Sequence, residues 1–135
     1  MTLTPESRII EVAAAVIVWN HRVLVTRRPE GTHLGGLWEF PGGKRESDES
    51  LADCLRRELK EELDLTVEVD EEITVIRHAD AERTVKLYFH RCTILEGTPQ
   101  PMYGQAVQWA DAAELSVLPF PPANRSLVLR LQQTL

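Results

Sequence analysis

Three glutamates, Glu58, Glu61 and Glu62, stand at the spacing i, i+3 and i+4 in the sequence. On an α-helix of about 3.6 residues per turn, this spacing directs all three carboxylates into one narrow sector. Like charges placed in this way repel one another and weaken the helix unless a cation lies between them. Hard oxygen ligands of this kind suit Mg²⁺ or Mn²⁺. The spacing therefore favours a divalent-metal site, and an acidic helix face turned to water is the alternative.

A helix must position these carboxylates, and the surrounding sequence predicts one from Leu51 to Leu63. Leucines recur one turn apart at positions 51, 55, 59 and 63, which gives the segment one apolar face. Ser50, followed three residues later by Asp53, is close to a capping box at the N-terminus. Gly42 and Gly43 lie just upstream, where a loop can bring backbone carbonyls toward the same cation. The helix is thus expected to pack on a core.

Composition describes an ordinary globular protein with a local excess of acid. The length of 135 residues fits one domain spanning residues 1–135, with 43% hydrophobic and 27% charged residues. The net charge is −6, and more than half of the 21 acidic residues lie between positions 46 and 72. A polynucleotide-binding protein would usually show a basic face, so that class is disfavoured. We expect a monomer, with a homodimer as the alternative.

The sequence shows no signal peptide and no apolar run of transmembrane length, which favours a cytoplasmic protein without a membrane partner. Cys54 and Cys92 lie far apart in the sequence and form no Cys-x-x-Cys pair. Each is therefore expected to be a buried, reduced thiol rather than a metal ligand.

Hydrophobic patterns predict an α/β domain. Residues 9–18 and 23–26 are predicted to form a hairpin that turns at Asn20 and His21. Further strands are expected at 66–69, 73–77, 84–94 and 106–110, with residues 84–94 paired to the preceding strand across a turn at 79–81. Apolar residues at helical spacing predict a second helix over residues 125–133.

The segment from Gly43 to Leu65 resembles the signature of the Nudix family. That signature reads Gly, five residues, Glu, seven residues, Arg-Glu, an aliphatic residue, any residue, Glu-Glu, any residue, Gly and an aliphatic residue. This chain matches at every fixed position except Asp64, which stands where the second Gly is expected. Asp is one of the few residue types tolerated in the left-handed conformation that ends a helix. The resemblance implies an α/β/α sandwich with a mixed sheet between helical layers.

The same resemblance implies the chemistry of the carboxylates. Nudix enzymes hydrolyse a nucleoside diphosphate linked to another group, so the substrate is expected to be a nucleotide. The implied metal ligands are Glu58, Glu61, Glu62 and the carbonyl oxygen of Gly42, with Mg²⁺ as the cofactor and Mn²⁺ as a substitute. Glu58 is also implied as an acceptor of the attacking water's proton. Arg57 would orient these carboxylates, and a surface ion pair with a neighbouring acid is its alternative role.

Three segments outside the signature resemble the MutT branch, which removes 8-oxo-dGTP from nucleotide pools. They are residues 26–28, 38–44 and 120–124. The resemblance implies that Asn124 reads the base, Arg28 contacts phosphate, Phe40 packs on the purine and Arg83 lines the base pocket. Each position also has a structural interpretation. Asn124 can cap the last helix, Phe40 can be core, and the two arginines can be solvated strand ends.

The amide of Asn124 suits the damaged base. In 8-oxoguanine, N7 carries a hydrogen beside the O6 acceptor, so one amide can donate to O6 and accept from N7–H. Ordinary guanine would set an acceptor against the amide carbonyl, and such an unpaired polar contact can reduce turnover by about 10⁴-fold. A single side chain can therefore separate the two nucleotides.

One position departs from the MutT pattern. MutT relatives often place a further Glu in the loop before the last strand, and residues 97–105 contain no acid. Tyr103 occupies that place, so the signature acts alone or Asp80, Glu82 or Asp111 substitutes. The sequence thus predicts a Mg²⁺-dependent pyrophosphatase acting on 8-oxo-dGTP. The alternatives are CTP or modified pyrimidine triphosphates, ADP-ribose, dinucleoside polyphosphates, or a nucleotide-binding module without catalysis.

Overall fold

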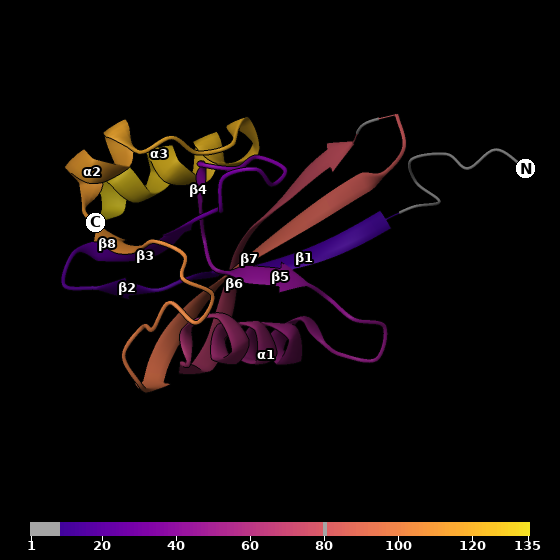
Figure 1. Ribbon diagram of the computed structural model, residues 1–135, viewed down its shortest axis with the longest axis horizontal. Helices are drawn as coiled ribbons and strands as arrows, with labels where there is room; N and C mark the ends of the chain where they lie inside the picture. The colour runs from indigo at the N-terminus through magenta and orange to yellow at the C-terminus, as the bar shows by residue number, and fades with distance from the viewer. Residues whose placement is uncertain (1–8, 80) are drawn as a thin grey trace, which may run out of the picture.

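The computed structural model describes residues 9–79 and 81–135, which form two β-sheets flanked by α-helices (Figure 1). The strands are β1 (Ile9–Val16), β2 (Val18–Trp19), β3 (Arg22–Arg27), β4 (Trp38–Glu39), β5 (Gly42–Lys44), β6 (Thr66–Ala79), β7 (Thr84–Glu96) and β8 (Val107–Ala110). The helices are α1 (Leu51–Leu63), α2 (Ala112–Val117) and α3 (Arg125–Thr134), with a 3₁₀ turn, η2 (Pro122–Asn124), before α3. α1 lies on one side of the sheets, and α2 and α3 lie on the other (Figure 1). The predicted α/β/α sandwich is confirmed.

The larger sheet is mixed and has the strand order β5-β1-β7-β6. β1 and β7 run parallel, whereas β5 pairs with β1 and β6 pairs with β7 in antiparallel register. The second sheet is antiparallel, because β3 pairs with β2 and β4 on one side and with β8 on the other. This arrangement puts β5, which carries the two glycines, beside α1.

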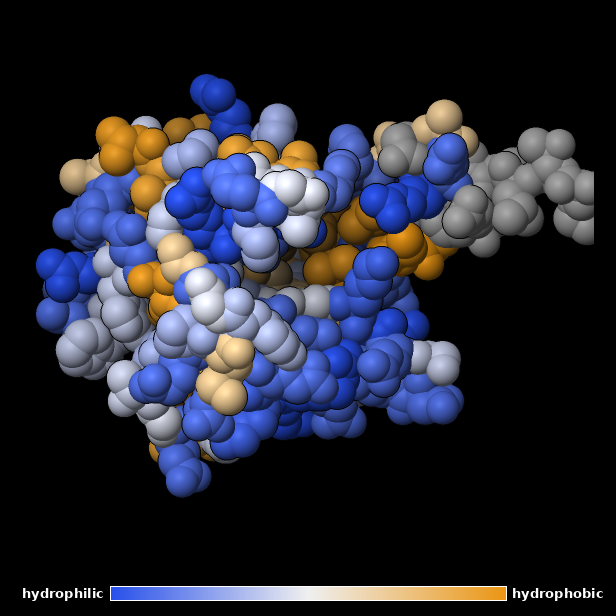
Figure 2. Space-filling view, in the orientation of Figure 1, coloured by the Kyte–Doolittle hydropathy of each residue, from blue (hydrophilic) through white to orange (hydrophobic). Residues whose placement is uncertain are grey.

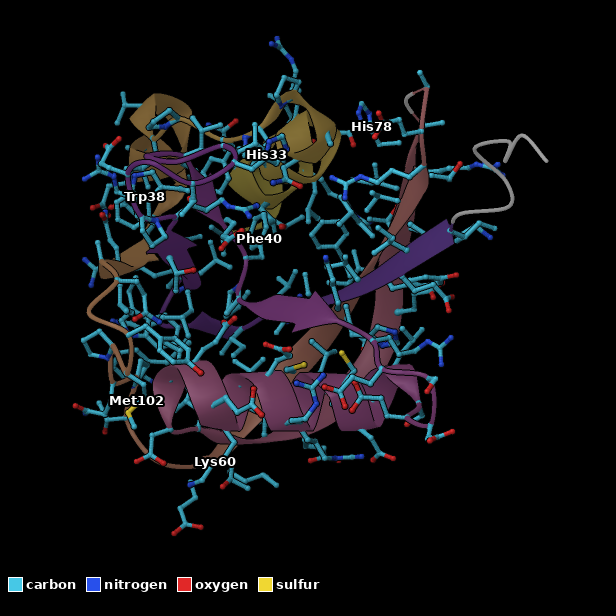
Figure 3. All side chains as sticks on the ribbon, turned by 45° about the vertical axis from the view of Figure 1, so that its right-hand side comes forward. His33, Trp38, Phe40, Lys60, His78 and Met102 are labelled. Carbon is cyan, nitrogen blue, oxygen red and sulfur yellow. The ribbon has the colours of Figure 1, made fainter. Side chains whose placement is uncertain are left out.

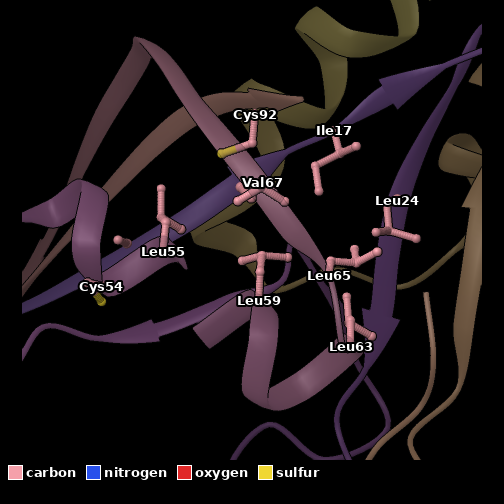
Figure 4. Packing of buried hydrophobic residues seen from close by; sticks show 11 residues of the cluster. Ile17, Leu24, Cys54, Leu55, Leu59, Leu63, Leu65, Val67 and Cys92 are labelled. Carbon is pink, nitrogen blue, oxygen red and sulfur yellow. The ribbon is translucent and has the colours of Figure 1, made fainter. Parts of the chain in front are cut away.

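Alternation along the central strand β1 divides the core into two layers. Ala13 and Ala15 pack toward α1, whereas Ala14 and Val16 pack toward α3. The layer under α1 also contains Leu55, Leu59, Leu63, Leu65, Val67 and both cysteines (Figure 4). Both cysteines are free and buried, as predicted. The apolar stripe of the helix therefore anchors the face that carries the glutamates.

α1 begins and ends where the sequence predicts. The Ser50 side chain accepts a hydrogen bond from the backbone N–H of Asp53, and Asp64 adopts a left-handed conformation with φ of 54°. The N–H groups of Asp64 and Leu65 donate to carbonyls of the last turn, which closes the C-terminus. The position at which the chain departs from the Nudix signature thus retains the backbone conformation that the signature requires.

The first hairpin differs from the prediction. Of the predicted first strand, residues 9–18, only the end that belongs to β2 pairs with β3, around a turn in which Asn20 and His21 both have positive φ. β1 instead joins the mixed sheet between β5 and β7, so the chain changes sheets at Ile17. The apolar run is continuous across Ile17, and for this reason the sequence shows no sign of the change.

The prediction of two helices was also incomplete. α2 is a third helix, and Asp111 and Glu114 form a capping box at its start. The segments predicted as 66–69 and 73–77 are one strand, β6, with register irregularities between them. The predicted turn at 79–81 includes Asp80, which lies outside the described residues. Within the described ranges, no helix combines the length and apolarity needed to cross a bilayer.

Candidate active site

Arg57 organises the carboxylates at the start of the site. Its guanidinium makes two hydrogen bonds with the Glu49 carboxylate, at 2.6 and 3.0 Å, and a third with Glu58 at 2.9 Å. It also donates to the backbone carbonyl of Lys44 at 3.1 Å. Hydrogen bonding to Arg57 lowers the pKa of Glu49 to about 2. The predicted orienting role of Arg57 fits this geometry, and its surface-charge alternative fits less well because the side chain is only 25% exposed.

Glu58 lies against the glycine pair of β5. A Cβ atom added to Gly43 would lie 2.3 Å from the carboxyl carbon of Glu58, so only glycine leaves room for this side chain. Burial raises the pKa of Glu58, and the Arg57 guanidinium opposes that effect. The Glu58 carboxylate therefore lies between the backbone of Gly43 and the guanidinium of Arg57.

Glu62 joins Glu58 one turn later. Its carboxyl group lies near that of Glu58 and near the backbone of Gly42, and both groups influence its pKa. Burial, together with the charges of Glu58 and Glu39, raises the pKa of Glu62 to about 8. The pair thus retains a proton near neutral pH, which a cation would replace.

Glu61 points elsewhere. Its side chain is half exposed and lies 3.4 Å from Arg57. Consistent with this, no three His, Cys, Asp or Glu side chains in the described part of the chain already gather as a metal cage. Glu58 and Glu62 are brought together, and Glu61 would have to turn toward them.

Glu39, at the end of β4, is a site residue that the sequence analysis missed. Burial raises the pKa of Glu39, and its carboxylate lies 3.4 Å from the guanidinium of Arg28. Its charge also acts on Glu62. Arg28, which was predicted to contact phosphate, is thereby linked to the carboxylates of α1. A lone acid before Phe-Pro-Gly-Gly has no partner at helical spacing, and only the resemblance of residues 38–44 to MutT pointed toward it.

Asn124 lies on the opposite side of the sheet from α1. Its residue is 7% exposed, and its side chain makes no capping hydrogen bond to α3. The alternative interpretation as an N-cap is therefore wrong for the side chain, because the preceding 3₁₀ turn runs directly into α3. η2 packs against β6, which places Asn124 beside the apolar face of the mixed sheet.

Phe40 is core rather than surface. It is 4% exposed, stacks on Phe120 with ring centroids 5.6 Å apart, and meets Phe89 edge-on at 5.8 Å. Figure 3 shows Phe40 near β5, between the helical layers. Direct packing of Phe40 on a purine stays a prediction, and Phe120, which is half-buried, is the more accessible ring of the pair.

The remaining predicted residues that the structure describes lie in the segments that flank β7 and β8. Arg83 is half-buried immediately before β7 and makes interactions there. Of the possible substitutes for the loop acid, Asp111 is occupied as the cap of α2 and Glu82 is exposed before β7. Asp80 lies outside the described residues, and Tyr103 is 69% exposed in the loop before β8.

The surface of the molecule differs between the α1 side and the α3 side. Figure 2 shows a hydrophilic surface over α1 and an apolar recess between the α3 layer and the projecting ends of β6 and β7. Ile76 and Leu87, both half-buried, pack at this side of the sheet against the cluster that contains Phe40 and Phe89. The geometry thus combines a carboxylate cluster on the α1 side with an apolar sheet face on the α3 side, where η2, which contains Asn124, packs against β6.

Comparison with known proteins accounts for this combination. Residues 13–130 match the model of the NUDIX domain family. A CTP pyrophosphohydrolase of Escherichia coli is 36% identical over 121 residues, covering 90% of each chain, and an 8-oxo-dGTP diphosphatase of Escherichia coli is 31% identical over 114 residues, covering 84% of this chain and 88% of the relative. The MutT structure described for Aliivibrio salmonicida and Vibrio cholerae superposes with a TM-score of 0.77 at 30% identity, covering 95% of this chain and all of the other. The chain therefore belongs to the Nudix hydrolase family and is one of its MutT-like members.

Proposed function

We propose that the protein is a Mg²⁺-dependent nucleoside triphosphate diphosphatase that cleaves 8-oxo-dGTP to 8-oxo-dGMP and pyrophosphate. The observation that carries this proposal is the Asn124 side chain, which is nearly buried beside an apolar recess and is not used as a helix cap. A nearly buried amide that does not cap a helix is suited to reading the edge of a base.

The carboxylates fit a divalent cation. Burial raises the pKa of both Glu58 and Glu62, so a cation would favour their charged forms, and Gly43 leaves space for Glu58 beside the backbone. Glu58, Glu61, Glu62 and the Gly42 carbonyl would hold the ion, as hard oxygen donors suit Mg²⁺. When bound, Mg²⁺ neutralises phosphate charge and lowers the pKa of an attacking water.

The chain's own residues would position the substrate and accept the proton of the attacking water. Glu58, which accepts a hydrogen bond from Arg57 at 2.9 Å, would accept a proton from the attacking water. Arg28, steadied by Glu39, contacts the phosphates as the substrate enters, and Arg83 borders the base. The hydrogen bonds of Arg57 to Glu49 hold the guanidinium beside the carboxylates when the negatively charged substrate binds.

Base selection follows from Asn124 and the apolar recess. The amide NH₂ donates to O6 of 8-oxoguanine, and the amide carbonyl accepts from N7–H. The purine ring then covers apolar side chains such as Ile76 and Leu87 at the face of the sheet. Normal guanine cannot satisfy the amide carbonyl, so it binds less well.

A second candidate substrate is CTP. It is favoured by the similarity to the Escherichia coli CTP pyrophosphohydrolase, whose identity to this chain is 36% against 31% for the 8-oxo-dGTP diphosphatase. The carboxylate side of the site serves either triphosphate, so only contacts to the base distinguish them.

A nucleotide panel tests both candidates. Purified protein is incubated with Mg²⁺ and 8-oxo-dGTP, dGTP, CTP, dCTP or ADP-ribose, and products are separated by chromatography. We expect the highest kcat/KM for 8-oxo-dGTP, with monophosphate and pyrophosphate as products. A higher value for CTP would transfer the assignment to the second candidate, and no hydrolysis of any nucleotide would contradict an enzymatic role.

A further inference from the structure

The loop between β7 and β8, residues 97–105, packs on the C-terminal end of α1. Figure 3 shows Met102, from this loop, beside that end of the helix. A Cβ atom added to Gly97 would lie 2.8 Å from the carbonyl oxygen of Asp64, so the two backbones are in close contact. The loop therefore covers the turn that carries Glu62.

The last turn of an α-helix leaves backbone carbonyls without partners, and this loop supplies them. The backbone N–H of Gln100 donates to the Leu63 carbonyl at 2.9 Å. The carbonyl of Glu62 accepts two hydrogen bonds, from the N–H of Met102 and from the side-chain amide of Gln105, each at 3.1 Å. The strongest attachment of the loop is thus to the backbone of Glu62.

Gln105 uses both ends of its amide. Its Nε2 donates to the Glu62 carbonyl, and its Oε1 accepts from the backbone N–H of Tyr103 at 3.0 Å. One side chain thereby fixes the loop tip and the helix end relative to each other. Met102 and Tyr103, which flank this contact, are 54% and 69% exposed, so packing contributes little to holding the tip.

The orientation of the Glu62 side chain depends on this backbone. Its carboxyl group lies near Glu58 and the backbone of Gly42. A Cβ atom added to Gly43 would lie 2.3 Å from the carboxyl carbon of Glu58, so β5 and α1 are in close contact at this point. A small rotation of the last helical turn would move the carboxyl group away from these partners. Groups that hold a metal ligand from behind typically affect metal affinity almost as strongly as the ligand.

We propose that Gln105 is a positioning residue for the metal site, holding the backbone of Glu62 so that its carboxylate meets Glu58. This inference rests on the proposed metal role of Glu62. It assigns a task to a loop that contains no acid: the loop contributes to the site by fixing a ligand of the helix.

Two variants of Gln105 separate this role from simple support of the loop. Gln105→Met keeps the length of the side chain and removes both hydrogen bonds. Gln105→Glu keeps the acceptor for the Tyr103 N–H but sets an oxygen against the Glu62 carbonyl. Gln100→Met is the matched control, because Gln100 is an exposed residue of the same loop that attaches through its backbone.

The measurement is the dissociation constant for Mn²⁺ alone, obtained by electron paramagnetic resonance on the nucleotide-free protein, together with the thermal midpoint. We expect both Gln105 variants to bind Mn²⁺ about 10-fold more weakly than the parent, with Gln100→Met unchanged. Gln105→Glu is the stricter variant, because an added negative charge would by itself tighten cation binding.

The outcomes distinguish this inference from the proposed function. Mn²⁺ affinity within twofold of the parent for both variants, or tighter binding by Gln105→Glu, would overturn the positioning role alone. A parent protein that binds no Mn²⁺ would overturn the proposed metal site and this inference with it. If Gln105→Met does not fold, Gln105→Glu decides, because it keeps the hydrogen bond that holds the loop tip.

Discussion

The two halves of the site are built by different means. On the α1 side, the carboxylates of Glu58 and Glu62 are surrounded by charged and backbone groups that lie close in sequence or on the adjoining β5. On the α3 side, Asn124 is nearly buried in η2, which packs against β6 near an apolar cluster drawn from several strands. Under the proposed function, the first half would carry out the reaction on any nucleotide and the second half would choose among bases.

Residues 38–44 connect the halves. Glu39 faces Arg28 and the carboxylates, whereas the next residue, Phe40, is stacked on Phe120 within the α3 layer. Because successive residues of an extended chain point in opposite directions, one short segment contributes to both environments. Under the proposed function, mutations on the two sides of this segment should therefore have different effects, on the rate for every nucleotide or on the choice of base.

The largest effect is expected for Glu62→Gln, which keeps the shape of the side chain and removes its charge. We expect kcat to fall by about 100-fold or more for every nucleotide, because the metal site loses a ligand. The thermal midpoint should not fall, since a buried carboxyl group next to Glu58 is replaced by a neutral amide. Steady-state kinetics on 8-oxo-dGTP and dGTP check this, with the exposed Glu68→Gln as control. Activity equal to that of the parent would show that the carboxylates are not the reaction centre.

The next effect should be selective. Asn124→Ala removes both proposed hydrogen bonds to 8-oxoguanine, which costs roughly 2 kcal/mol or more, or about 30-fold in the ratio of kcat/KM for 8-oxo-dGTP over dGTP. Stability should change little, because the side chain makes no capping bond. Asn124→Asp, which keeps the shape but cannot donate to O6, should lose the same selectivity. An unchanged ratio in both variants would remove the assignment of 8-oxoguanine.

The stability of the metal-free protein should depend on pH through the proton that Glu62 binds. The pKa of Glu62 is raised from an ordinary value of 4.5 to about 8, so the folded protein binds this proton more tightly than the unfolded chain does. Through this group, the free energy of unfolding of the metal-free protein falls as pH rises from about 4.5 to about 8.

Binding of Mg²⁺ must displace the same proton. Its affinity should rise by about tenfold per pH unit below pH 8 and level off above it. Calorimetric titrations of Mg²⁺ at pH 6, 7 and 8 measure this slope, and Glu62→Gln should flatten it. A parent protein whose Mg²⁺ affinity is independent of pH would contradict a shared proton.

The smallest effect is expected two residues after Glu62. Asp64→Gly restores the residue of the Nudix signature at a position with φ of 54°. Relief of the left-handed conformation is offset by the greater freedom of glycine in the unfolded chain and by loss of the exposed Lys60–Asp64 ion pair at 2.8 Å. The free energy of unfolding should change by less than about 1 kcal/mol, with kcat unchanged. Chemical denaturation measures this, and a large loss of activity would show that the C-terminus of α1 does more than hold Glu62.

Local patterns explain how much of the molecule could be predicted. The bounds of α1, its Ser50 cap and its left-handed Asp64 all follow from residues within one helix, and all are confirmed. The sheet change at Ile17 depends on which distant strands compete for β1, and the sequence of that strand is apolar on both sides of the change. α2 is six residues long, too short for a clear helical period.

The site shows the same division. Glu58 and Glu62 were predicted from spacing, and the structure brings them together. Glu39 was missed because its partners, Arg28 and Glu62, approach it only through the fold. Phe40 is predicted to pack on the purine, and that prediction stands beside its contacts with Phe89 and Phe120, which the sequence does not show. Residues that act through neighbours along a helix are visible in sequence, and residues that act through neighbours in space are not.

The buried thiol of Cys54 gives the carboxylate side a further property. Cys54 lies one turn before Glu58, is fully buried, and has its Sγ 3.5 Å from the carbonyl oxygen of Gly43. Burial raises its pKa to about 12, so the folded protein presents a protonated sulfur that alkylating reagents do not reach. A reagent can modify Cys54 only after α1 separates from β5, so the rate of modification measures how often this local opening occurs. Cys54 is thus an intrinsic chemical reporter of how often α1 separates from β5.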